Sequence, residues 1–356
     1  MEGKTPEGFK IVSSWNGLTK NKDGEAELHL LHKFEPEPVR ADVGDFLSQA
    51  NPVTINNPET RHRRSKERIV VPLNDIHFGF RRENGEMIPT HDPEALDKVL
   101  QLCEELQPNE IVINGDGIDL PELSSFSPDS KAMVETTQAS LDGCHTFLAY
   151  LRAVCPNSKM VYLEGNHEIR SSRTLLKNAM PLFGVRQANM PESFAVNSIP
   201  FLLRLDELEI DYISGYPANA YDFNDRLKII HGEFATQNTA QKYLGMYACS
   251  VCFGHTHREE LASHTYPNGY KKIAFNPGAL CRTDGIMPSV HSGVDVNGHH
   301  VERSEQWQKG VSVLYGKAGD NPFNFDIIDL DNEKVRYNNR VYTARQDVMA
   351  IYDKIK

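Results

Sequence analysis

The sequence has no long hydrophobic run and no surplus of basic residues. None of its apolar stretches reaches the length of about 18 residues that suggests a membrane-spanning helix, and its first ten residues, MEGKTPEGFK, lack the apolar core of a secretory signal peptide. We therefore expect a soluble, cytoplasmic protein without a membrane partner. The formal net charge is −11, with 38 Lys and Arg against 49 Asp and Glu. This balance counts against a protein that coats nucleic acid by general electrostatic attraction, but not against an enzyme that binds one phosphate group locally.

The sequence also lacks a cysteine framework. Its six cysteines are scattered, and most lie inside apolar runs such as LDGCHTFLAYLRAVCP, a usage that fits an intracellular compartment. Cys249 and Cys252 form a CxxC pair, but no second pair is present to complete a zinc site. We interpret this pair as ordinary core residues.

Residues 1–66 differ in pattern from the rest of the chain. Two strand-like runs, FKIVSSW and AELHLLHKF, flank NKDGE, whose Asp-Gly is typical of a hairpin turn. A short helical stretch, DVGDFLSQA, follows, and then a polar connection that ends in the basic run RHRRSKER. We predict a small N-terminal extension over residues 1–66. Its basic run is either a solvated linker or a contact to a phosphate backbone through Arg61, Arg63 and Arg64.

From residue 67 onward, strand-like and helix-like segments alternate. The apolar runs RIVVPLND, EIVINGD, KMVYLEG, RLKIIHG, CSVCFGH and KKIAFNPG are typical of strands, whereas DPEALDKVLQLCEEL begins with an Asp cap and a Pro in the first turn of a helix. This alternation predicts an α/β fold with covered central strands. The runs GVSVLYG, FNFDIIDL and KVRYNNRVY have little helix between them and predict a second, more antiparallel sheet. We place one domain at residues 67–345 and a C-terminal helical tail at 346–356.

Polar residues follow the carboxyl ends of five of these strand-like runs. Sites in α/β sheets form at that edge, so five such ends side by side would bring two Asp, one Asn and five His into one pocket. In chain order these residues are Asp75, His77, Asp116, Asn166, His167, His231, His255 and His257. Each short motif alone is weak, because Asp-x-His and Gly-Asp are more often turns than ligands. The ordered set of five is a strong signal.

The five blocks together resemble a known enzyme superfamily. Asp-x-His, Gly-Asp-x-x-Asp, Gly-Asn-His-Glu, a lone His and Gly-His-x-His occur in this order between residues 75 and 257. In this pattern the sequence resembles the calcineurin-like metallophosphoesterase superfamily over residues 68–280, and the stretch 281–310 is similar to phage-encoded, nuclease-like members. The resemblance implies a sandwich of two mixed β-sheets flanked by helices, with a two-metal site at the carboxyl edges of the strands.

The resemblance also implies a set of metal ligands. One ion would be held by Asp75, His77 and His257, the other by Asn166, His231 and His255, and Asp116 would bridge the two. Carboxylate, amide and imidazole ligands suit Mn, Fe or Zn, and of these we expect Mn. Two such ions about 3.5–4 Å apart clamp a phosphoryl group and lower the pKa of a shared water, so that a metal-bridging hydroxide becomes the nucleophile.

One histidine of the set is left without a metal. The resemblance makes His167 the acid that protonates the leaving oxygen, a role that contributes about 10²–10⁴-fold. The family often has Asp at the next position; this chain has Glu168, whose carboxylate we expect to orient the His167 imidazole. Asp119 would be an outer hydrogen-bonding residue and not a ligand. Candidate substrate contacts are Arg170, Arg258, Arg282 and His291, with surface positions as the alternative for the arginines.

The predicted activity is metal-dependent hydrolysis of a phosphoester, by a phosphodiesterase or nuclease that takes DNA or RNA as a candidate substrate. The direct supply of hydroxide and the basic run ahead of the domain favour a diester. The acidic charge balance keeps a phosphomonoesterase or nucleotide pyrophosphatase open. A non-catalytic scaffold of the same fold would be expected to have lost a ligand or His167, and neither is missing. The sequence leaves the oligomeric state open.

Overall fold

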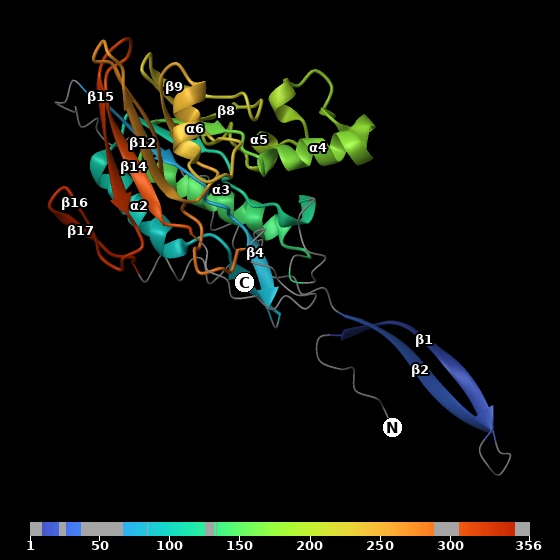
Figure 1. Cartoon of the computed structure of the whole chain (residues 1–356). Helices are drawn as coiled ribbons and strands as arrows, with labels where there is room; N and C mark the ends of the chain where they lie inside the picture. Colours follow the sequence, from blue (N-terminus) through green and yellow to red (C-terminus); the bar gives the residue numbers. More distant parts are fainter. Residues whose placement is uncertain are drawn as a thin grey trace. The chain divides into compact units, whose positions relative to one another are not determined.

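The computed structural model describes residues 9–20, 26–36, 67–83, 85–124, 132, 134–287 and 306–345. The chain divides into two compact units, Met1–Asn56 and Asn57–Lys356. In the first unit, β1 (Phe9–Lys20) and β2 (Ala26–Pro36) pair antiparallel as a hairpin (Figure 1). The predicted short helix, the basic run up to residue 66 and the C-terminal tail at 346–356 lie outside the described residues.

The larger sheet of the second unit has six strands in the order β15-β14-β3-β6-β7-β8. Its strands are β3 (Arg68–Leu73), β6 (Glu110–Asn114), β7 (Lys159–Leu163), β8 (Ile210–Ile213), β14 (Gly310–Gly316) and β15 (Phe323–Asp329). Strands β3, β6, β7 and β8 are parallel, whereas β14 runs antiparallel to both β3 and β15. The central parallel strands are continuous apolar runs because both of their faces are covered.

The second sheet has five strands in the order β12-β13-β11-β10-β9. They are β9 (Tyr221–Asn224), β10 (Leu227–Ile230), β11 (Ser250–Phe253), β12 (Glu259–Thr265) and β13 (Lys271–Pro277). Strand β11 is parallel to both of its neighbours, β10 and β13, and the two edge strands are antiparallel. Both sheets are therefore mixed, as predicted.

The strands after residue 310 correct one prediction. We expected them to form a second, antiparallel sheet, but β14 and β15 extend the larger sheet beside β3. Only β16 (Val335–Tyr337) and β17 (Arg340–Tyr342) pair separately, as a small hairpin. The strands β4 (Phe80–Glu83) and β5 (Glu86–Pro89) form another short hairpin. Strand order depends on pairing between segments far apart in the sequence, which local composition does not encode.

Helices cover the outer faces of both sheets (Figure 1). Helices α2 (Pro93–Leu106) and α3 (Thr137–Val154) pack on the larger sheet, and α6 (Thr239–Met246) packs on the smaller one. Val71 contributes to the core under α2 and α3, while its neighbour Val70 faces the core between the sheets. This period-two alternation gives each strand two buried faces. The result is the predicted α/β architecture, in which two mixed sheets pack face to face with helices outside.

The remaining helices are short and lie between β6 and β8. They are η1 (Pro121–Leu123), α4 (Glu168–Asn178), η3 (Met180–Leu182), η4 (Glu192–Phe194) and α5 (Ile199–Leu202). In the described part of the chain, no helix combines the length and the apolar character that crossing a bilayer requires.

Two buried amides join the sheets at their carboxyl edges. The Asn74 side chain, just after β3, donates to the Phe253 carbonyl at the end of β11, at 3.0 Å. The Asn114 side chain, at the end of β6, donates to the Ile230 carbonyl at the end of β10, at 2.9 Å. A third bond of 2.9 Å runs from Asn114 Nδ2 to Asn74 Oδ1. Because buried polar groups need such partners, these bonds hold the strand ends of both sheets around one point.

Candidate metal centre

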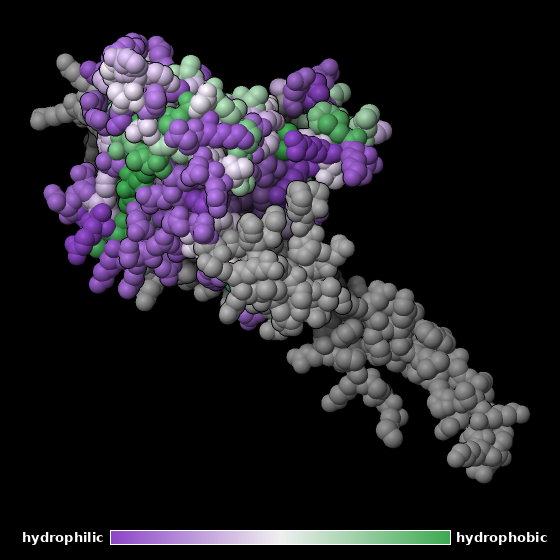
Figure 2. Space-filling view, in the orientation of Figure 1, coloured by the Kyte–Doolittle hydropathy of each residue, from purple (hydrophilic) through white to green (hydrophobic). Residues whose placement is uncertain are grey.

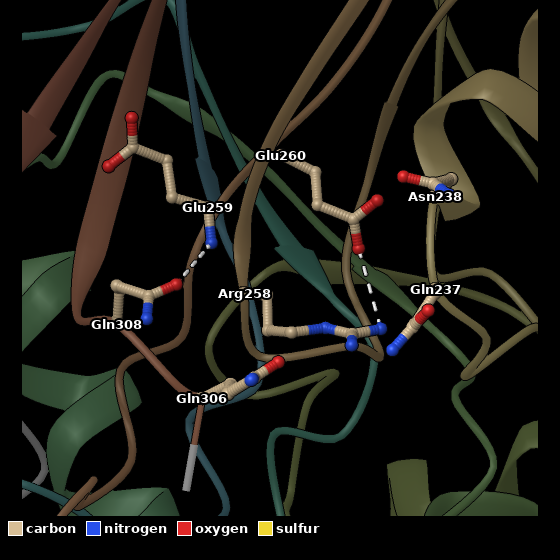
Figure 3. Close-up of a pocket in the computed structure, with 7 residues that line it drawn as sticks. All are labelled: Gln237, Asn238, Arg258, Glu259, Glu260, Gln306 and Gln308. Atoms are coloured by element: carbon tan, nitrogen blue, oxygen red, sulfur yellow. Dashed lines mark hydrogen bonds and ion pairs between the residues drawn. The ribbon is translucent and has the colours of Figure 1, made fainter.

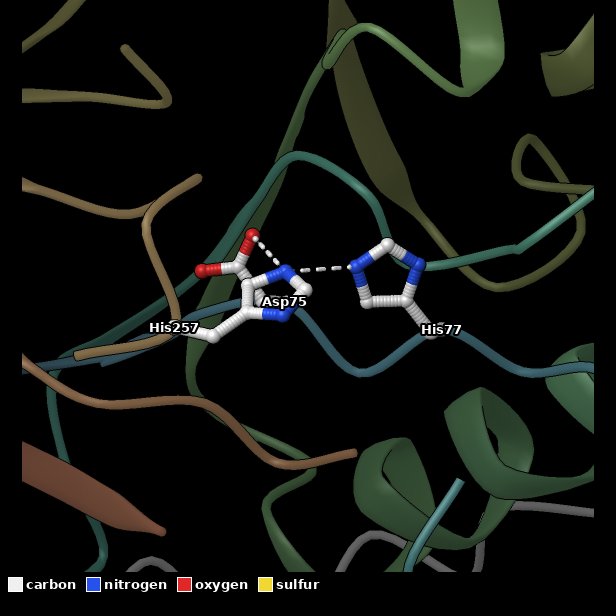
Figure 4. A group of neighbouring side chains, drawn as sticks. All are labelled: Asp75, His77 and His257. Atoms are coloured by element: carbon white, nitrogen blue, oxygen red, sulfur yellow. Dashed lines mark hydrogen bonds and ion pairs between the residues drawn. The ribbon is translucent and has the colours of Figure 1, made fainter. Parts of the chain in front are cut away.

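Asp75, His77 and His257 form one compact group of potential metal ligands (Figure 4). All three side chains are buried. The Nε2 atoms of His77 and His257 lie 2.9 Å apart, and His257 Nε2 lies 3.4 Å from Asp75 Oδ1. Asp75 and His77 follow β3, and His257 follows β11. The ligand atoms of each such group lie within 4.8 Å of one another, which is the spacing that one shared ion requires.

Asp116, His231 and His255 form a second group. His231 Nε2 lies 3.3 Å from Asp116 Oδ2 and 2.9 Å from the side-chain oxygen of Asn166. The rings of His231 and His255 meet edge to face, with centroids 5.3 Å apart. The Asn166 side chain, which follows β7, therefore lies against this group.

Asp116 connects the two groups. Besides its contact with His231, Asp116 Oδ2 lies 3.8 Å from His77 Nε2 and 3.6 Å from His167 Nε2. The trio of His77, Asp116 and His167 also has the spacing of a metal-binding group. The structure thus brings all eight residues singled out at the strand ends into one cluster, with a single carboxylate at its centre.

Five of these residues have strained backbone conformations. Asp75, His77, Asp116, His255 and His257 all have positive φ, between 48° and 69°. Non-glycine residues rarely occupy this left-handed region, at a cost of about 1–3 kcal/mol each. Such strain persists where the surrounding structure overdetermines it, and it concentrates at functional sites. These five residues follow the ends of β3, β6 and β11, where their side chains meet in the cluster.

Two glycines of the motifs are required by close approach. A Cβ atom at Gly165 would lie 2.4 Å from Asp116 Oδ1 and 2.5 Å from the Asp116 backbone nitrogen. A Cβ at Gly254 would lie 2.7 Å from Asp75 Oδ2. The glycines of Gly-Asn-His-Glu and Gly-His-x-His therefore leave room for the two central carboxylates.

The hydrogen bonds of His231 define the ring nitrogen that faces the centre. His231 Nδ1 lies 2.8 Å from the Asn114 carbonyl oxygen, which only accepts a hydrogen, so Nδ1 carries one. Burial opposes protonation of His231, but the nearby charge of Asp116 outweighs it and raises the His231 pKa to about 10. Without a cation, Nε2 is therefore protonated toward Asp116 and Asn166. A metal ion would take the place of this proton and would be bound by the lone pairs of His231 Nε2, Asp116 and Asn166. A histidine ligand usually binds in this way, with its other ring nitrogen donating a hydrogen bond.

Two other histidines of the cluster stay neutral. Burial, aided by the charge of His167, lowers the His77 pKa to about 4. Burial, aided by the charge of His231, likewise lowers the His255 pKa to about 4. Neutral imidazole is the form that binds metal. For both carboxylates of the cluster, histidine charges overcome burial and lower the pKa: His257 for Asp75, and His167 for Asp116. Buried carboxylates and neutral imidazoles that face one another directly are the donor set that a divalent transition metal prefers.

Asp119 holds two histidines from outside the ligand set. Its Oδ1 lies 3.4 Å from His77 Nδ1 and 3.0 Å from His167 Nδ1. Burial opposes ionisation of Asp119, but these contacts with His167 and His77 keep its pKa well below the usual range. A carboxylate behind a histidine fixes its tautomer and ring orientation. Asp119 has the position expected of an outer hydrogen-bonding residue.

His167 lies beside the cluster with Arg170 against it. Arg170 Nη1 lies 2.8 Å from His167 Nδ1, and Arg170 Nη2 lies 2.8 Å from His167 Nε2. Arg170 Nη1 also donates to the Asp119 carbonyl at 2.9 Å. Burial lowers the His167 pKa, but the charge of Asp116 outweighs it, so the net shift is upward. Arg170 is the candidate substrate residue that the structure brings to the centre.

Glu168 has different partners from those we expected. Its carboxylate, predicted to orient His167, accepts hydrogen bonds from the backbone of the Gly-Asp loop and from the Tyr162 hydroxyl. The donors are the N–H groups of Asp116, Gly117, Ile118 and Gly165 at 2.8–3.2 Å, and the Tyr162 O–H at 2.7 Å. Burial and the charge of Asp116 raise the Glu168 pKa, and the donors oppose that shift. Glu168 therefore fixes the loop that carries Asp116, and Asp119 orients His167.

Arg258 and Arg282 pair with residues outside the cluster. Arg258 points along a polar cavity of about 580 Å³ beside His257, where it donates to the Thr236 carbonyl and lies 3.5 Å from Glu260 (Figure 3). The cavity is lined by Gln237, Asn238, Arg258, Glu259, Glu260, Gln306 and Gln308. Arg282 is paired with Asp284. His291 lies outside the described residues.

Sequence reasoning missed several residues that support the cluster. Asn74 and Asn114 join the sheets, and Cys281 Sγ lies 3.9 Å from His257 Nδ1. Asn74 and Asn114 directly precede motif residues at strand ends, the one signal by which they could have been found.

Comparisons with known proteins add a distant relative. No family model matches the chain. The chain is 28% identical over 233 residues to the Gene 54 protein of Mycobacterium phage D29, an alignment that covers 64% of this chain and 84% of that protein. The name of that protein states no activity, so the function of this chain has to be inferred from the geometry of the cluster.

Proposed function

We propose that the chain is a metal-dependent phosphoester hydrolase of the calcineurin-like metallophosphoesterase type, and within it a phosphodiesterase or nuclease. One observation carries this proposal. Asp116 belongs to the group of His231 and His255 and also lies beside His77 of the other predicted ligand set, while His167, which lies 3.6 Å from the same carboxylate, belongs to neither predicted set. This is the arrangement needed to hold two cations beside one acid.

The predicted ligand sets describe how the chain would hold two divalent ions, with Mn as the expected metal and Fe or Zn as alternatives. When bound, such ions polarise a phosphoryl group and lower the pKa of water so that it can attack phosphorus near neutral pH. The chain supplies the rest. Asp119 and Glu168 fix the rings and the loop, and the buried setting strengthens each charge that acts on the substrate.

His167 is suited to donate a proton to the leaving oxygen. Its Nδ1 faces the carbonyl and carboxylate oxygens of Asp119, and its Nε2 lies 3.6 Å from Asp116 Oδ2 and 2.8 Å from an Arg170 nitrogen. The charge of Asp116 raises the His167 pKa, which favours the protonated form that an acid needs. The Arg170 guanidinium is placed to bind a non-bridging phosphate oxygen through its planar fork.

The polar cavity beside His257 supports a substrate larger than phosphate. It adjoins the first ligand group through Arg258, which follows His257 directly, and through Gln308, whose N–H donates to the His257 carbonyl at 3.0 Å. Its amide side chains can bind both donors and acceptors of an esterified group. A phosphomonoesterase or nucleotide pyrophosphatase acting on a small substrate is the second candidate, because the acidic charge of the chain disfavours long polyanions.

A hydrolysis panel tests the proposal. The purified chain, supplied with Mn²⁺, is assayed on a chromogenic phosphodiester, a chromogenic monoester, and single- and double-stranded DNA and RNA. Diester hydrolysis that requires the metal and falls in His167→Ala supports the proposal. Hydrolysis of the monoester alone would favour the second candidate, and no turnover on any substrate with metal bound would contradict hydrolysis of these ester classes.

A further inference from the structure

The segment between β7 and β8 leaves an unusual amount of apolar surface uncovered. Eight of the fourteen large exposed hydrophobic side chains in the described residues lie between Leu176 and Leu202. Figure 2 shows this green surface among purple, on the α4–α5 segment at the upper right. The most exposed are Met180 at 66%, Leu182 at 50% and Phe183 at 49%. Scattered single residues would need no explanation, but a cluster of this kind marks an interaction surface.

Helix α4 has almost no buried face. Of its eleven residues only Glu168, the first, is buried. Helices of this length are marginal without tertiary packing.

The charge of this segment is opposite to that of the chain. Residues 169–202 contain four basic residues and one acidic residue, a net charge of +3, whereas the whole chain carries −11. Arg170, Arg173 and Lys177 recur at helical spacing of three and four, so they lie along one side of α4. Within the described residues, neither Arg173 nor Lys177 forms an ion pair, and both are exposed.

This basic row begins at the metal centre. Arg170 contacts both ring nitrogens of His167. Arg173 follows Arg170 by three residues on the same side of α4. Lys177 lies one turn farther along the helix. A surface for a second copy of the chain has no need to begin at the catalytic histidine, whereas a polymeric substrate must extend away from the bond that is cleaved.

We propose that the α4–α5 segment, residues 169–202, binds a single strand of nucleic acid and guides it to the metal centre. Arg170, Arg173 and Lys177 contact successive phosphates. The exposed aromatic rings of Phe183 and Phe201 offer stacking surfaces to unpaired bases, and this combination of cations and aromatic rings is how proteins bind single strands without sequence preference. This inference rests on the proposed hydrolase function, whereas the binding experiment that tests it does not require hydrolysis.

Binding is measured with the full chain in EDTA, so that no cleavage occurs. The probe is a fluorescein-labelled oligothymidylate of about 20 nucleotides, followed by fluorescence anisotropy from about 50 to about 200 mM salt. The charge variant is Arg173→Ser with Lys177→Ser, and the stacking variant is Phe183→Ala with Phe201→Ala. The matched control is Lys334→Ser with Arg336→Ser, which removes two exposed charges from the β16–β17 hairpin.

We expect the charge variant to bind about tenfold more weakly at low salt and to lose about 1.4 from the slope of log affinity against log salt, for two phosphate contacts. The stacking variant should bind at least about fivefold more weakly with its salt slope unchanged. The control should match the wild type. Equal binding by all variants, or no binding by the wild type, overturns the inference. An altered oligomeric state of the stacking variant with undiminished oligonucleotide binding also overturns it and assigns the surface to a second copy.

The two proposals fail separately. Wild-type hydrolysis of a small chromogenic diester with Mn²⁺, together with no oligonucleotide binding, would remove the strand-binding surface and leave the hydrolase. Variant-sensitive oligonucleotide binding without any hydrolysis would retain the surface and remove the hydrolase.

Discussion

The Nε2 atoms of His77 and His257 face each other at 2.9 Å. At most one of these nitrogens carries a hydrogen between them. Asp119 lies behind His77, and Asp75 lies beside His257. Two imidazoles that meet at their lone-pair positions, with carboxylates around them, form a site arranged for a cation. This pair lies at the meeting point of β3 and β11, and it carries the interpretation of the cluster as a metal centre.

Asp116→Asn should abolish metal binding and hydrolysis together. The substitution keeps the size of the side chain but removes the charge that connects both ligand groups. We expect metal affinity to fall by more than about 100-fold, because the loss of a residue that only hydrogen-bonds to a ligand already lowers affinity by up to about 100-fold. Metal content after gel filtration checks this, with Asp211→Asn, an exposed carboxylate on β8, as the control. Full metal content in Asp116→Asn would show that this residue bridges nothing.

Glu168→Gln should destabilise the fold. The amide cannot accept from all the N–H groups that now converge on the carboxylate, and its own NH₂ would face them. The expected loss is about 3 kcal/mol or more in the free energy of unfolding, measured by urea denaturation of the metal-free chain. Glu207→Gln, in an exposed pair with Arg204, should change stability by less than about 1 kcal/mol. Lost activity with unchanged stability would restore the catalytic role first expected for Glu168.

Gly165→Ala should displace Asp116, because the new methyl group would lie 2.4 Å from its Oδ1. We expect a stability loss of roughly 1–3 kcal/mol and weaker metal binding. Gly245→Ala is the matched control, since a Cβ there meets open space in helix α6; it should be neutral or stabilise the chain by about 0.5–1 kcal/mol. Thermal unfolding and metal titration follow both variants, and equal behaviour would remove the close-approach argument.

Metal affinity should rise with pH because of His231. Its pKa of about 10 in the metal-free chain means that the ring is protonated at neutral pH and must lose that proton to bind a metal. His77 and His255, with pKa values of about 4, are already neutral. Binding should therefore release about one proton, and affinity should rise about tenfold per pH unit up to about pH 10. Calorimetry in buffers of different ionisation enthalpy measures this release; affinity independent of pH would contradict it.

The sequence predicted the residues of the cluster better than the residues that hold them in place. The potential ligands at the strand ends were recognisable because each motif is local and the order of the motifs is informative. The fold class followed from alternating strands and helices. The place of β14 and β15 did not, because β14 pairs with β3 across more than two hundred residues of sequence.

Glu168 shows a different limit. It is adjacent to His167 in sequence, which suggested that its carboxylate orients that ring. Helix α4 begins at Glu168, and neighbouring residues of a helix point in different directions. Asp119, which does contact the ring, is 48 residues away in the chain, and only the fold brings the two together.

Bound metal and diester hydrolysis, measured together in His167→Ala, test the central claim most directly. His167 lies close enough to Asp116 and His77 to share a metal ion with them, so this experiment distinguishes an acid from a metal ligand. We predict that the variant retains the metal content of the wild type, with two ions per chain, while its turnover falls about 10²–10⁴-fold. Loss of metal in proportion to loss of turnover would make His167 a ligand and would contradict its role as the acid.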